Sequence, residues 1–307
     1  MESNEFLLEK FISSLQARNM ASNTIIAYQR DLEDFFSYCE ANQLQLQDIE
    51  ASDLRSWIGH RIADQHKSSS TVRRQVASIR QFMQWATLNK FLVNDNSQDI
   101  QVKRRSEYLP QALEVDLIMQ LLDQPDPADP NQLELWHRDK AIMELFYSTG
   151  MRLNELYMLN VGGLNHSTML VRVVGKGNKE RIIPFGRKAS EAIRVWMRVY
   201  QTWLGREVGH ADPLFVSRHG TRLSVSQIGR RITTQATRAG IDTNIHPHLF
   251  RHSFATHMLS GAGDIRAVQE MLGHSSLATT QIYTHLDFNT LAKSYDNAHP
   301  RAYKPKS

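Results

Sequence analysis

The first third of the chain places its apolar residues at the three- and four-residue spacing of amphipathic helices. This spacing predicts helices from Phe6 to Leu15, from Ser22 to Phe36, from Asp53 to Ala63 and from Ser69 to Ala86. In the fourth helix an apolar stripe, with caps offered by Ser69, Ser70 and Thr71, lies opposite three arginines: Arg73, Arg74 and Arg80. The pattern predicts a compact helical domain over residues 1–103.

The remaining two thirds combine helical spacing with one stretch rich in β-formers. Helices are predicted over about 114–123, 135–147, 188–204, 224–240 and 247–261. The segment QPDPADPNQ (124–132) is predicted to be a loop, because its three prolines disfavour a helix or a central strand. The runs LVRVV (170–174) and RIIPF (181–185) flank GKGNKE and predict a hairpin. The expected fold is therefore mainly α with a small antiparallel β-sheet.

The segment QVKRRSEYLP (101–110) interrupts the periodicity, carries three consecutive basic residues and ends in proline. We interpret it as an interdomain linker at residues 104–111, with a second domain over residues 112–307. The 307-residue length suits two domains, each large enough to bury its own core.

Composition excludes several classes of protein. The chain is 41% hydrophobic and 22% charged, as in ordinary globular proteins, and its single cysteine, Cys39, excludes an internal disulfide. No apolar run is long enough for a membrane span or a signal peptide, so a cytoplasmic protein that does not contact membranes is expected. Residues 172–251 carry 15 Lys or Arg against five Asp or Glu. Such a segment suits nucleic acid, although a solvated basic face explains it equally well.

The stretch from 246 to 285 carries the candidate chemistry. A guanidinium, two imidazoles and a phenol fall at predicted helix surfaces and ends instead of core positions: Arg251, His248, His274 and Tyr283. A guanidinium matches two phosphoryl oxygens, imidazoles move protons near neutral pH, and a phenol can attack phosphorus. No carboxylate cluster stands nearby to hold Mg²⁺, so no metal or other cofactor is expected. His248 and His252 have the spacing of a helical zinc pair, but the HExxH glutamate is missing and zinc is the weaker alternative.

The residues alone leave two further assignments undecided. Arg152 follows the helix stop at Gly150 and begins the next helix, where free N–H groups favour a phosphate; a plain surface arginine is the competing interpretation. Lys176 and Lys179 are equally good candidates to reach DNA from the hairpin tip.

Four motifs resemble the conserved boxes of the tyrosine recombinases, the lambda-integrase family: STGMRLNEL, GKGNKERIIP, HLFRHSFATHML and LGHSSLATTQIYTH. The resemblance covers essentially the whole chain. It implies a tyrosine recombinase that needs no cofactor and works through a 3′-phosphotyrosyl intermediate and a Holliday junction. The implied catalytic set is Arg152, Lys176, His248, Arg251, His274 and the nucleophile Tyr283. The chain departs from the family where Phe250 replaces the usual Leu and where the linker lacks an Asn-Pro pair.

The resemblance also implies how the chain would hold double-stranded DNA. An N-terminal core-binding domain of the SAM-like type would clamp one side of the recombination site, and the C-terminal α+β catalytic domain the other. The expected DNA contacts are Arg73, Arg74, Arg80, Lys103, Arg104, Arg105, Lys179, Arg181, Arg230 and Arg231.

The tail DFNTLAKSYDNAHPRA (287–302) resembles that of family members that resolve chromosome dimers. Phe288, Leu291 and Tyr295 form a short apolar stripe, and the resemblance implies that this segment docks into a neighbouring subunit. The implied partners are a second recombinase of the same kind, in a heterotetramer on two sites, and a cell-division DNA translocase. The alternatives are a mobile-element or phage integrase and a non-catalytic architectural DNA-binding protein.

Overall fold

The computed structural model describes residues 3–63, 65, 67–98, 100, 112–175, 180–242, 245–261, 271, 295–296 and 298–302. The chain divides into two compact units, Met1–Leu109 and Pro110–Ser307. The predicted linker, residues 104–111, lies entirely outside the described residues, so its bounds remain a prediction.

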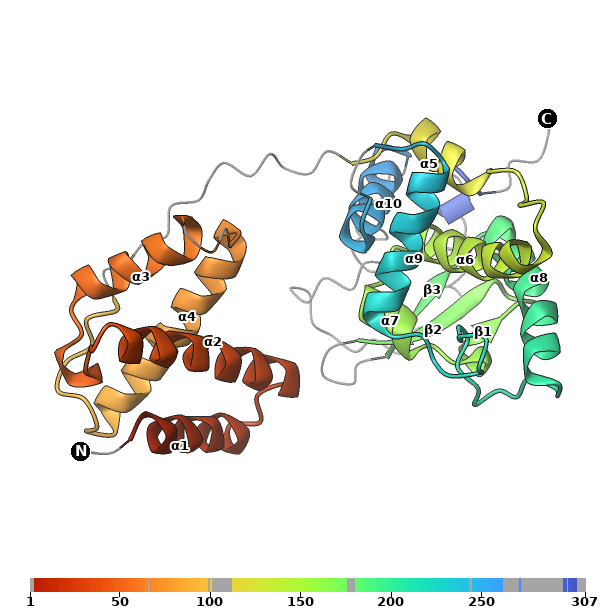
Figure 1. Ribbon diagram of the computed structural model, residues 1–307. Helices are drawn as coiled ribbons and strands as arrows, with labels where there is room; N and C mark the ends of the chain where they lie inside the picture. Colours follow the sequence, from red (N-terminus) through yellow and green to blue (C-terminus); the bar gives the residue numbers. More distant parts are fainter. Residues whose placement is uncertain are drawn as a thin grey trace. The chain divides into compact units, whose positions relative to one another are not determined.

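The described residues of the first unit form four α-helices, which are labelled in Figure 1. They are α1 (Asn4–Ala17), α2 (Ser22–Ala41), α3 (Ala51–Ala63) and α4 (Ser69–Leu88), with a short 3₁₀ turn at Leu46–Asp48. Helix α4 is capped by Ser68, whose Oγ accepts a hydrogen bond from the Thr71 backbone N–H at 3.2 Å. The cap is therefore one residue earlier than the three candidates, because Ser69 to Thr71 already have helical geometry.

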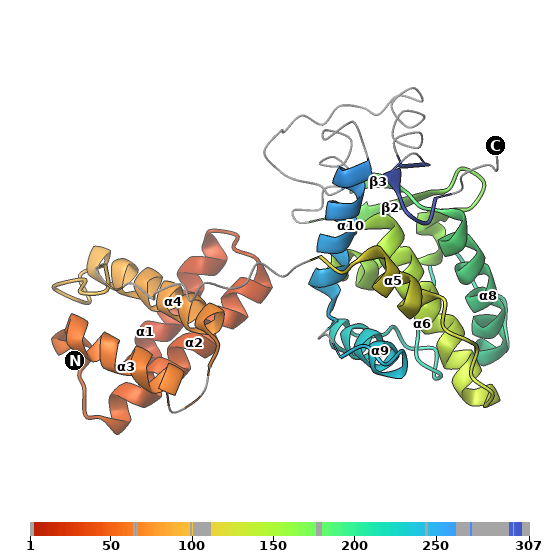
Figure 2. The same cartoon turned by 90° about the horizontal axis from the view of Figure 1, so that it is seen from above.

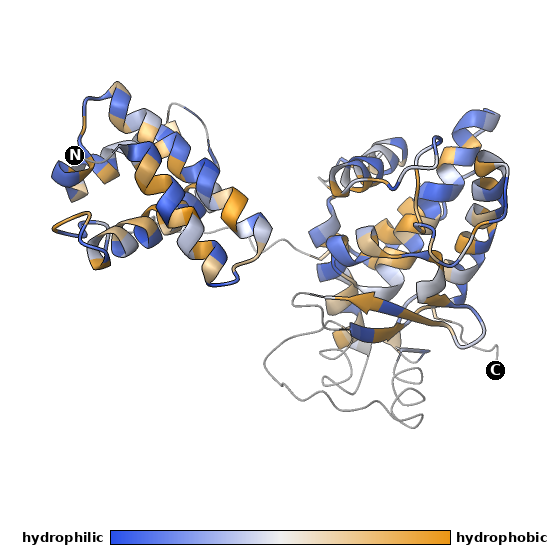
Figure 3. Cartoon of the chain, turned by 90° about the horizontal axis from the view of Figure 1, so that it is seen from below, coloured by the Kyte–Doolittle hydropathy of each residue, from blue (hydrophilic) through white to orange (hydrophobic). Residues whose placement is uncertain are grey.

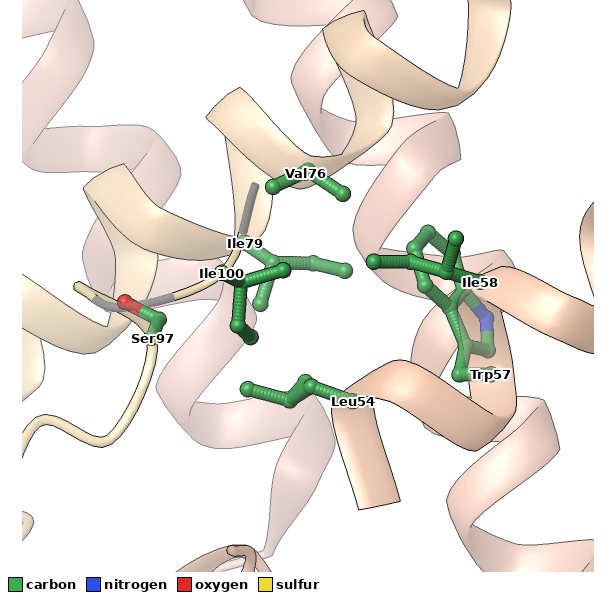
Figure 4. A pocket seen from close by; sticks show the side chains of 7 residues that line it. All are labelled: Leu54, Trp57, Ile58, Val76, Ile79, Ser97 and Ile100. Carbon is green, nitrogen blue, oxygen red and sulfur yellow. The ribbon is translucent and has the colours of Figure 1, made fainter. Parts of the chain in front are cut away.

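Aromatic rings fill the core of this unit. The rings of Phe11 and Phe82 meet edge to face with centroids 5.6 Å apart, and Trp57 packs edge-on against Phe35 at 5.5 Å. Figure 4 shows Trp57 of α3 near Val76 of α4, beside a cavity of about 10 Å³. Space of that size holds about one water molecule, so the cavity is a packing detail and not a ligand site. Cys39 is fully buried in the same core, and burial raises the pKa of its thiol to about 12.

The second unit is built around α6 (Pro130–Thr149). Every side chain from Ala141 to Thr149 is buried, as expected for a helix that is covered on all sides. Helix α6 packs against α5 (Val115–Leu122), α8 (Arg187–Leu204), α9 (Val225–Arg238) and α10 (Pro247–Gly261). Figure 2 shows α6 flanked by α5, α8 and α10. The short helix α7 (Leu153–Met158) follows α6, and a 3₁₀ turn at Val161–Gly163 leads into the sheet.

The sheet has three antiparallel strands in the order β1-β2-β3: Leu164–Asn165, Leu170–Val174 and Glu180–Pro184. Strands β2 and β3 form the predicted hairpin, with Val171 opposite Ile183 and Val173 opposite Arg181. Hydrophobic colouring runs along these strands in Figure 3, in line with the burial of Val171 and Val173. The predicted fold class, mainly α with a small antiparallel sheet, is confirmed.

The start of α6 differs from the prediction. The helix begins at Pro130, five residues before the expected start, and Asp129 caps it by accepting the Asn131 backbone N–H at 2.9 Å. The prediction of a loop treats the prolines of 124–132 as incompatible with a helix at every position of this segment. At the first helical position, however, the missing proline N–H costs nothing and the fixed φ favours the helix.

Candidate active site

Arg152 occupies a tight junction between α6 and α7. Gly150 ends α6 in the left-handed region, with φ of 56°, and a Cβ at this position would lie 2.1 Å from Cδ1 of Phe254. Only glycine satisfies both constraints. Two residues later, Arg152 forms the N-cap of α7, as predicted, and its side chain remains 44% exposed.

The Glu155 carboxylate binds two arginines at this junction. Its carboxylate is almost fully buried, and it accepts hydrogen bonds from Nη1 of Arg152 at 3.0 Å and from Nη1 and Nη2 of Arg181 at 2.5 and 2.8 Å. It also accepts the Arg152 backbone N–H at 2.6 Å. Burial alone would raise the pKa of Glu155, but the bonds from Arg181 and Arg152 outweigh burial and hold this pKa below its usual value. The carboxylate is therefore ionised and fixes both guanidinium groups.

Arg251 reaches the same junction from α10. Its Nη1 donates to the carbonyl oxygen of Gly150 at 2.5 Å. Burial first, and then the positive charges of Arg152 and Arg181, lower the pKa of Arg251 to about 10. Among the described residues, three guanidinium groups thus meet at this junction: Arg152 and Arg181 bind Glu155, and Arg251 binds the Gly150 carbonyl oxygen close by. Such a place favours an anion with several oxygens, such as a phosphate.

His248 lies one helical turn before Arg251 on α10 and is exposed. Its ring centroid is 6.3 Å from that of His246, whose pKa is lowered by burial and then by His248. The described residues contain no group of three or more His, Cys, Asp or Glu able to hold a metal ion, so the His248 and His252 pair finds no further ligands there.

The other predicted catalytic residues, Lys176, His274 and Tyr283, lie outside the described residues. So do Lys103, Arg104, Arg105 and Lys179. One described residue close to His274 in the sequence contacts the arginine cluster at the junction of α6 and α7. The carbonyl oxygen of Met271, three residues before His274, accepts a hydrogen bond from Nε of Arg181 at 3.3 Å.

Several arginines predicted to contact DNA have partners within the protein, and their contact with DNA stays a prediction. In the first unit, Arg74 pairs with the buried Asp31, and Arg80 donates to the backbone oxygens of Ser97 at 3.3 Å and Ile100 at 2.8 Å. Arg73 is half-buried. Helical spacing identified the face opposite the core, but it could not reveal the carboxylate and carbonyl groups that other segments bring to that face.

Predicted DNA contacts of the second unit also have partners within the protein. The Arg181 side chain is only 11% exposed because its guanidinium binds Glu155 and the Met271 carbonyl oxygen. It therefore supports the site by holding Glu155 in place. Arg231 pairs with the buried Asp139 of α6 at 2.6 Å and ties α9 to α6. Its neighbour Arg230 is exposed and has no ion pair among the residues described, so it is the better candidate for DNA.

Glu155 was not among the predicted site residues. A signal for it was present, because a Glu three residues after the N-cap is the second half of a capping box. The structure shows this half of the box, in which the Glu155 carboxylate accepts the Arg152 backbone N–H; an arginine side chain has no acceptor with which to form the other half. The link from Glu155 to Arg181 was not predictable, because it joins residues of α7 and β3.

The described part of the tail packs on its own domain. Tyr295 is buried, its hydroxyl lies 2.6 Å from Ser148 Oγ, and its ring stacks on His299 with centroids 4.7 Å apart. Arg301 donates to both oxygens of Asp123, at 2.9 and 3.0 Å, and forms an ion pair with Glu144. In the single chain the partners of these residues lie on α6 and directly after α5, and docking of the tail into a neighbouring subunit stays a prediction. Phe288 and Leu291 lie outside the described residues.

No helix within the described ranges combines the length and the apolar character that a membrane crossing requires.

Two family models match the chain. Residues 111–290 match the phage integrase family, and residues 8–90 match the phage integrase N-terminal SAM-like domain. Together they cover both structural units.

Curated relatives match over nearly the full length. The chain is 42% identical to tyrosine recombinase XerC of Histophilus somni, over 98% of this chain and 99% of the relative. It is 40% identical to XerC of Chromobacterium violaceum (97% and 95% covered) and 37% identical to tyrosine recombinase XerD of Staphylococcus epidermidis (96% and 99% covered).

Solved structures share the fold. A XerH site-specific recombinase bound to a palindromic difH substrate is 23% identical with a TM-score of 0.68, covering 95% of this chain and 84% of that one. A lambda integrase dimer bound to a COC′ core site is 16% identical with a TM-score of 0.67, covering 99% and 98%. The predicted resemblance, including its XerC-like character, is confirmed. The chain belongs to the tyrosine recombinases of the phage integrase family and is a site-specific recombinase that breaks and rejoins DNA.

Proposed function

We propose that the enzyme cleaves DNA with the set Arg152, Lys176, His248, Arg251, His274 and Tyr283. The observation that carries this proposal is the meeting of Arg152, Arg181 and Arg251 at the junction of α6 and α7. Guanidinium groups suit the nonbridging oxygens of a scissile phosphate, whose charge increases in the transition state. Arg152 and Arg251 would hold these oxygens, and Arg181 would keep the site in place through Glu155.

The chemistry follows from the residue types. The phenolic oxygen of Tyr283 attacks the phosphorus, the bond from phosphorus to the 5′ oxygen breaks, and a 3′-phosphotyrosyl ester forms. A free phenol has a pKa near ~10, so its proton must be removed as the attack proceeds, a role we assign to His248. Lys176 gives a proton to the departing 5′ oxygen, and His274 donates a hydrogen bond to the phosphate. The ester conserves the bond energy, so rejoining through a Holliday junction requires neither ATP nor a metal.

We infer that each of the two units contacts DNA. Arg230 on the exposed side of α9 is the best-supported contact, with the linker residues Lys103, Arg104 and Arg105, the hairpin residue Lys179, and Arg73 of α4 as further candidates. Backbone contacts of this kind position a protein on the duplex without reading sequence.

We further propose that the enzyme acts in the cytoplasm and resolves chromosome or plasmid dimers at cell division. The names of its full-length relatives, XerC and XerD, support this role. The expected assembly is a heterotetramer with a XerD-like partner on two recombination sites, regulated by a cell-division DNA translocase.

A nicked suicide substrate carrying a candidate recombination site tests the proposal. After cleavage the short fragment diffuses away, so a covalent adduct accumulates with the wild type. We expect no adduct from Tyr283→Phe, at least a hundredfold less from Arg251→Gln, and an unchanged yield in the presence of EDTA. An adduct from Tyr283→Phe would overturn the assignment of the nucleophile, and loss of the wild-type adduct in EDTA would overturn the metal-free mechanism.

A further inference from the structure

A buried carboxylate holds Arg74 at the surface of the first unit. The side chain of Asp31 on α2 is 2% exposed, whereas the side chain of Arg74 on α4 is 46% exposed. Nη1 of Arg74 donates to Oδ2 of Asp31, and the Ser78 hydroxyl donates to the same oxygen at 2.7 Å. The carboxylate is therefore fixed where α2 packs on α4, and the guanidinium extends from it towards solvent.

Only one nitrogen of Arg74 is used within the protein. Nη1 also donates to the Ala27 carbonyl oxygen at 3.5 Å, while Nε and Nη2 have no hydrogen-bond partner among the residues that the structure describes. These two nitrogens form one edge of the guanidinium, and such an edge matches two oxygens of a phosphate. Arg74 can therefore bind an anion without first giving up a bond inside the protein.

Two other arginines of the same unit are bound differently. Arg61 donates from all three of its nitrogens to side chains of the unit, and it is only 6% exposed. Arg80 donates from Nε and Nη2 to backbone oxygens. The donors of Arg61 and Arg80 stabilise the fold, whereas the outer edge of Arg74 does not contribute to it.

The pair of Arg74 and Asp31 resembles a pair in the candidate active site. Arg152 is 44% exposed and donates from Nη1 to Glu155, whose side chain is 3% exposed. In each pair a buried carboxylate holds one end of an exposed guanidinium. An arginine held in this way loses less rotational freedom when it binds a phosphate, and its planar group can contact carboxylate and phosphate together.

We propose that Asp31 is a positioning residue for DNA binding, which holds Arg74 in the orientation in which Nε and Nη2 bind a backbone phosphate. This inference rests on the proposed function, in which the first unit contacts DNA. Phosphate contacts carry no sequence information, so Asp31 should strengthen binding to any duplex to the same degree. The first unit carries none of the proposed catalytic residues, so affinity, and not the cleavage rate, reports the position of Arg74.

The test measures the affinity of the full-length protein for two fluorescein-labelled duplexes at several salt concentrations. One duplex carries the candidate recombination site and the other a scrambled sequence. Asp31→Asn removes the charge that holds Arg74, and Arg74→Ala removes the guanidinium. Asp34→Asn is the matched control, because Asp34 lies three residues further along α2 and its partner Arg61 is fully bound within the unit. Thermal melting of each variant is measured in parallel.

Charge and position predict opposite results for Asp31→Asn. The loss of a negative charge alone favours binding to DNA, so Asp34→Asn should bind as tightly as wild type or more tightly. We expect Asp31→Asn to weaken binding to both duplexes by about threefold or more, but not to weaken it in a protein that already carries Arg74→Ala. Arg74→Ala alone should lower the salt dependence of binding by about one unit of slope.

Unchanged or tighter binding by a folded Asp31→Asn protein would overturn the proposal. A weakening that persists in the Arg74→Ala background would also overturn it, because Asp31 would then act as a general stabiliser of the unit. If Asp31→Asn does not fold, Arg74→Lys decides. Lysine keeps the charge but lacks the planar guanidinium, so its affinity should be as low as that of Arg74→Ala, and wild-type affinity would overturn the proposal.

The two proposals fail separately. An adduct in Tyr283→Phe removes the nucleophile assignment and leaves the affinities of the Asp31 and Arg74 variants unaffected. Wild-type affinity and salt dependence in Arg74→Ala would remove the positioning role of Asp31 and leave the cleavage assignment intact.

Discussion

Both terminal nitrogens of the Arg181 guanidinium donate hydrogen bonds to the Glu155 carboxylate, at 2.5 and 2.8 Å. This bidentate ion pair is nearly buried. Arg152 shares the same carboxylate at 3.0 Å. The position of an arginine expected to hold the scissile phosphate therefore depends on an acidic residue that does not itself attract phosphate.

Glu155→Gln should impair cleavage more than DNA binding. The amide cannot balance the charge of Arg181, so we expect a loss of about 3 kcal/mol in stability and at least about a tenfold slower cleavage at saturating DNA. Affinity for DNA should not fall, because a negative charge is removed. Urea unfolding and adduct kinetics measure both effects. Glu134→Gln, at a more exposed carboxylate that accepts from Trp203, is the control, and cleavage at the wild-type rate by Glu155→Gln would contradict the role given to Glu155.

Gly150→Ala should destabilise the catalytic domain strongly. Alanine would adopt the left-handed conformation at a cost and would also clash with Phe254, so we expect about 3 kcal/mol in total. Gly240→Ala is matched in backbone conformation, with φ of 70°, but has no atom within 4 Å of the added Cβ. It should cost only about 1 kcal/mol. Equal losses in the two variants would show that the contact with Phe254 is unimportant.

The neighbours Arg230 and Arg231 should respond in opposite ways. Arg230→Ala should leave thermal stability unchanged and lower the salt dependence of DNA binding by about one unit of slope, because one phosphate contact is lost. Arg231→Ala should cost about 2 kcal/mol in stability, because the buried Asp139 loses a partner. Binding titrations at several salt concentrations, together with melting curves, separate the two. A large change in stability for Arg230→Ala would contradict its assignment to the DNA surface.

His299 should make the catalytic domain sensitive to acid. Its Nδ1 lies 3.1 Å from the Arg301 backbone N–H and accepts from it, and its Nε2 lies 3.3 Å from the Tyr147 carbonyl oxygen, so the neutral ring fits this place. Burial is the largest cause that lowers the pKa of His299 to about 3, and the charges of Arg301 and His257 also lower it. The hydrogen bond to the Tyr147 carbonyl oxygen acts in the opposite direction.

Because this pKa lies below that of the unfolded state, the unfolded chain binds the proton first and stability falls as pH drops from about 6.5 towards 3. The contribution is up to about 1.4 kcal/mol per pH unit. His299→Gln retains a donor and an acceptor but does not titrate, so its unfolding free energy should vary less between pH 7 and 5. Parallel pH dependence in the two proteins would refute this assignment.

Local patterns predicted most of the fold. Apolar spacing located the helices, and the alternation around GKGNKE located β2 and β3. The predicted start of α6 is five residues too late, because proline disfavours a helix interior but favours the first helical position. Asp129 and Pro130 form such a favourable helix start. The short strand β1 was not predicted, since two residues carry no measurable period.

The site was predictable where its residues lie close together in sequence. Gly150, Arg152 and the pair His248 and Arg251 fall within single local motifs. The contacts of Arg181, Arg231 and Arg301 join segments far apart in the chain, and a sequence pattern cannot specify which carboxylate an arginine will meet. For the same reason, the packing of Tyr295 on its own domain became visible only in three dimensions.

The thiol of Cys39 is enclosed in the N-terminal core, and its pKa is raised to about 12, so it should react slowly with maleimides at neutral pH. It is the sole cysteine of the chain. Fluorophores can therefore be attached to cysteines introduced at exposed positions in either unit, without first replacing the native residue. Energy transfer between two such dyes would then report the distance between the two units, with and without DNA, in a protein whose interior is unaltered.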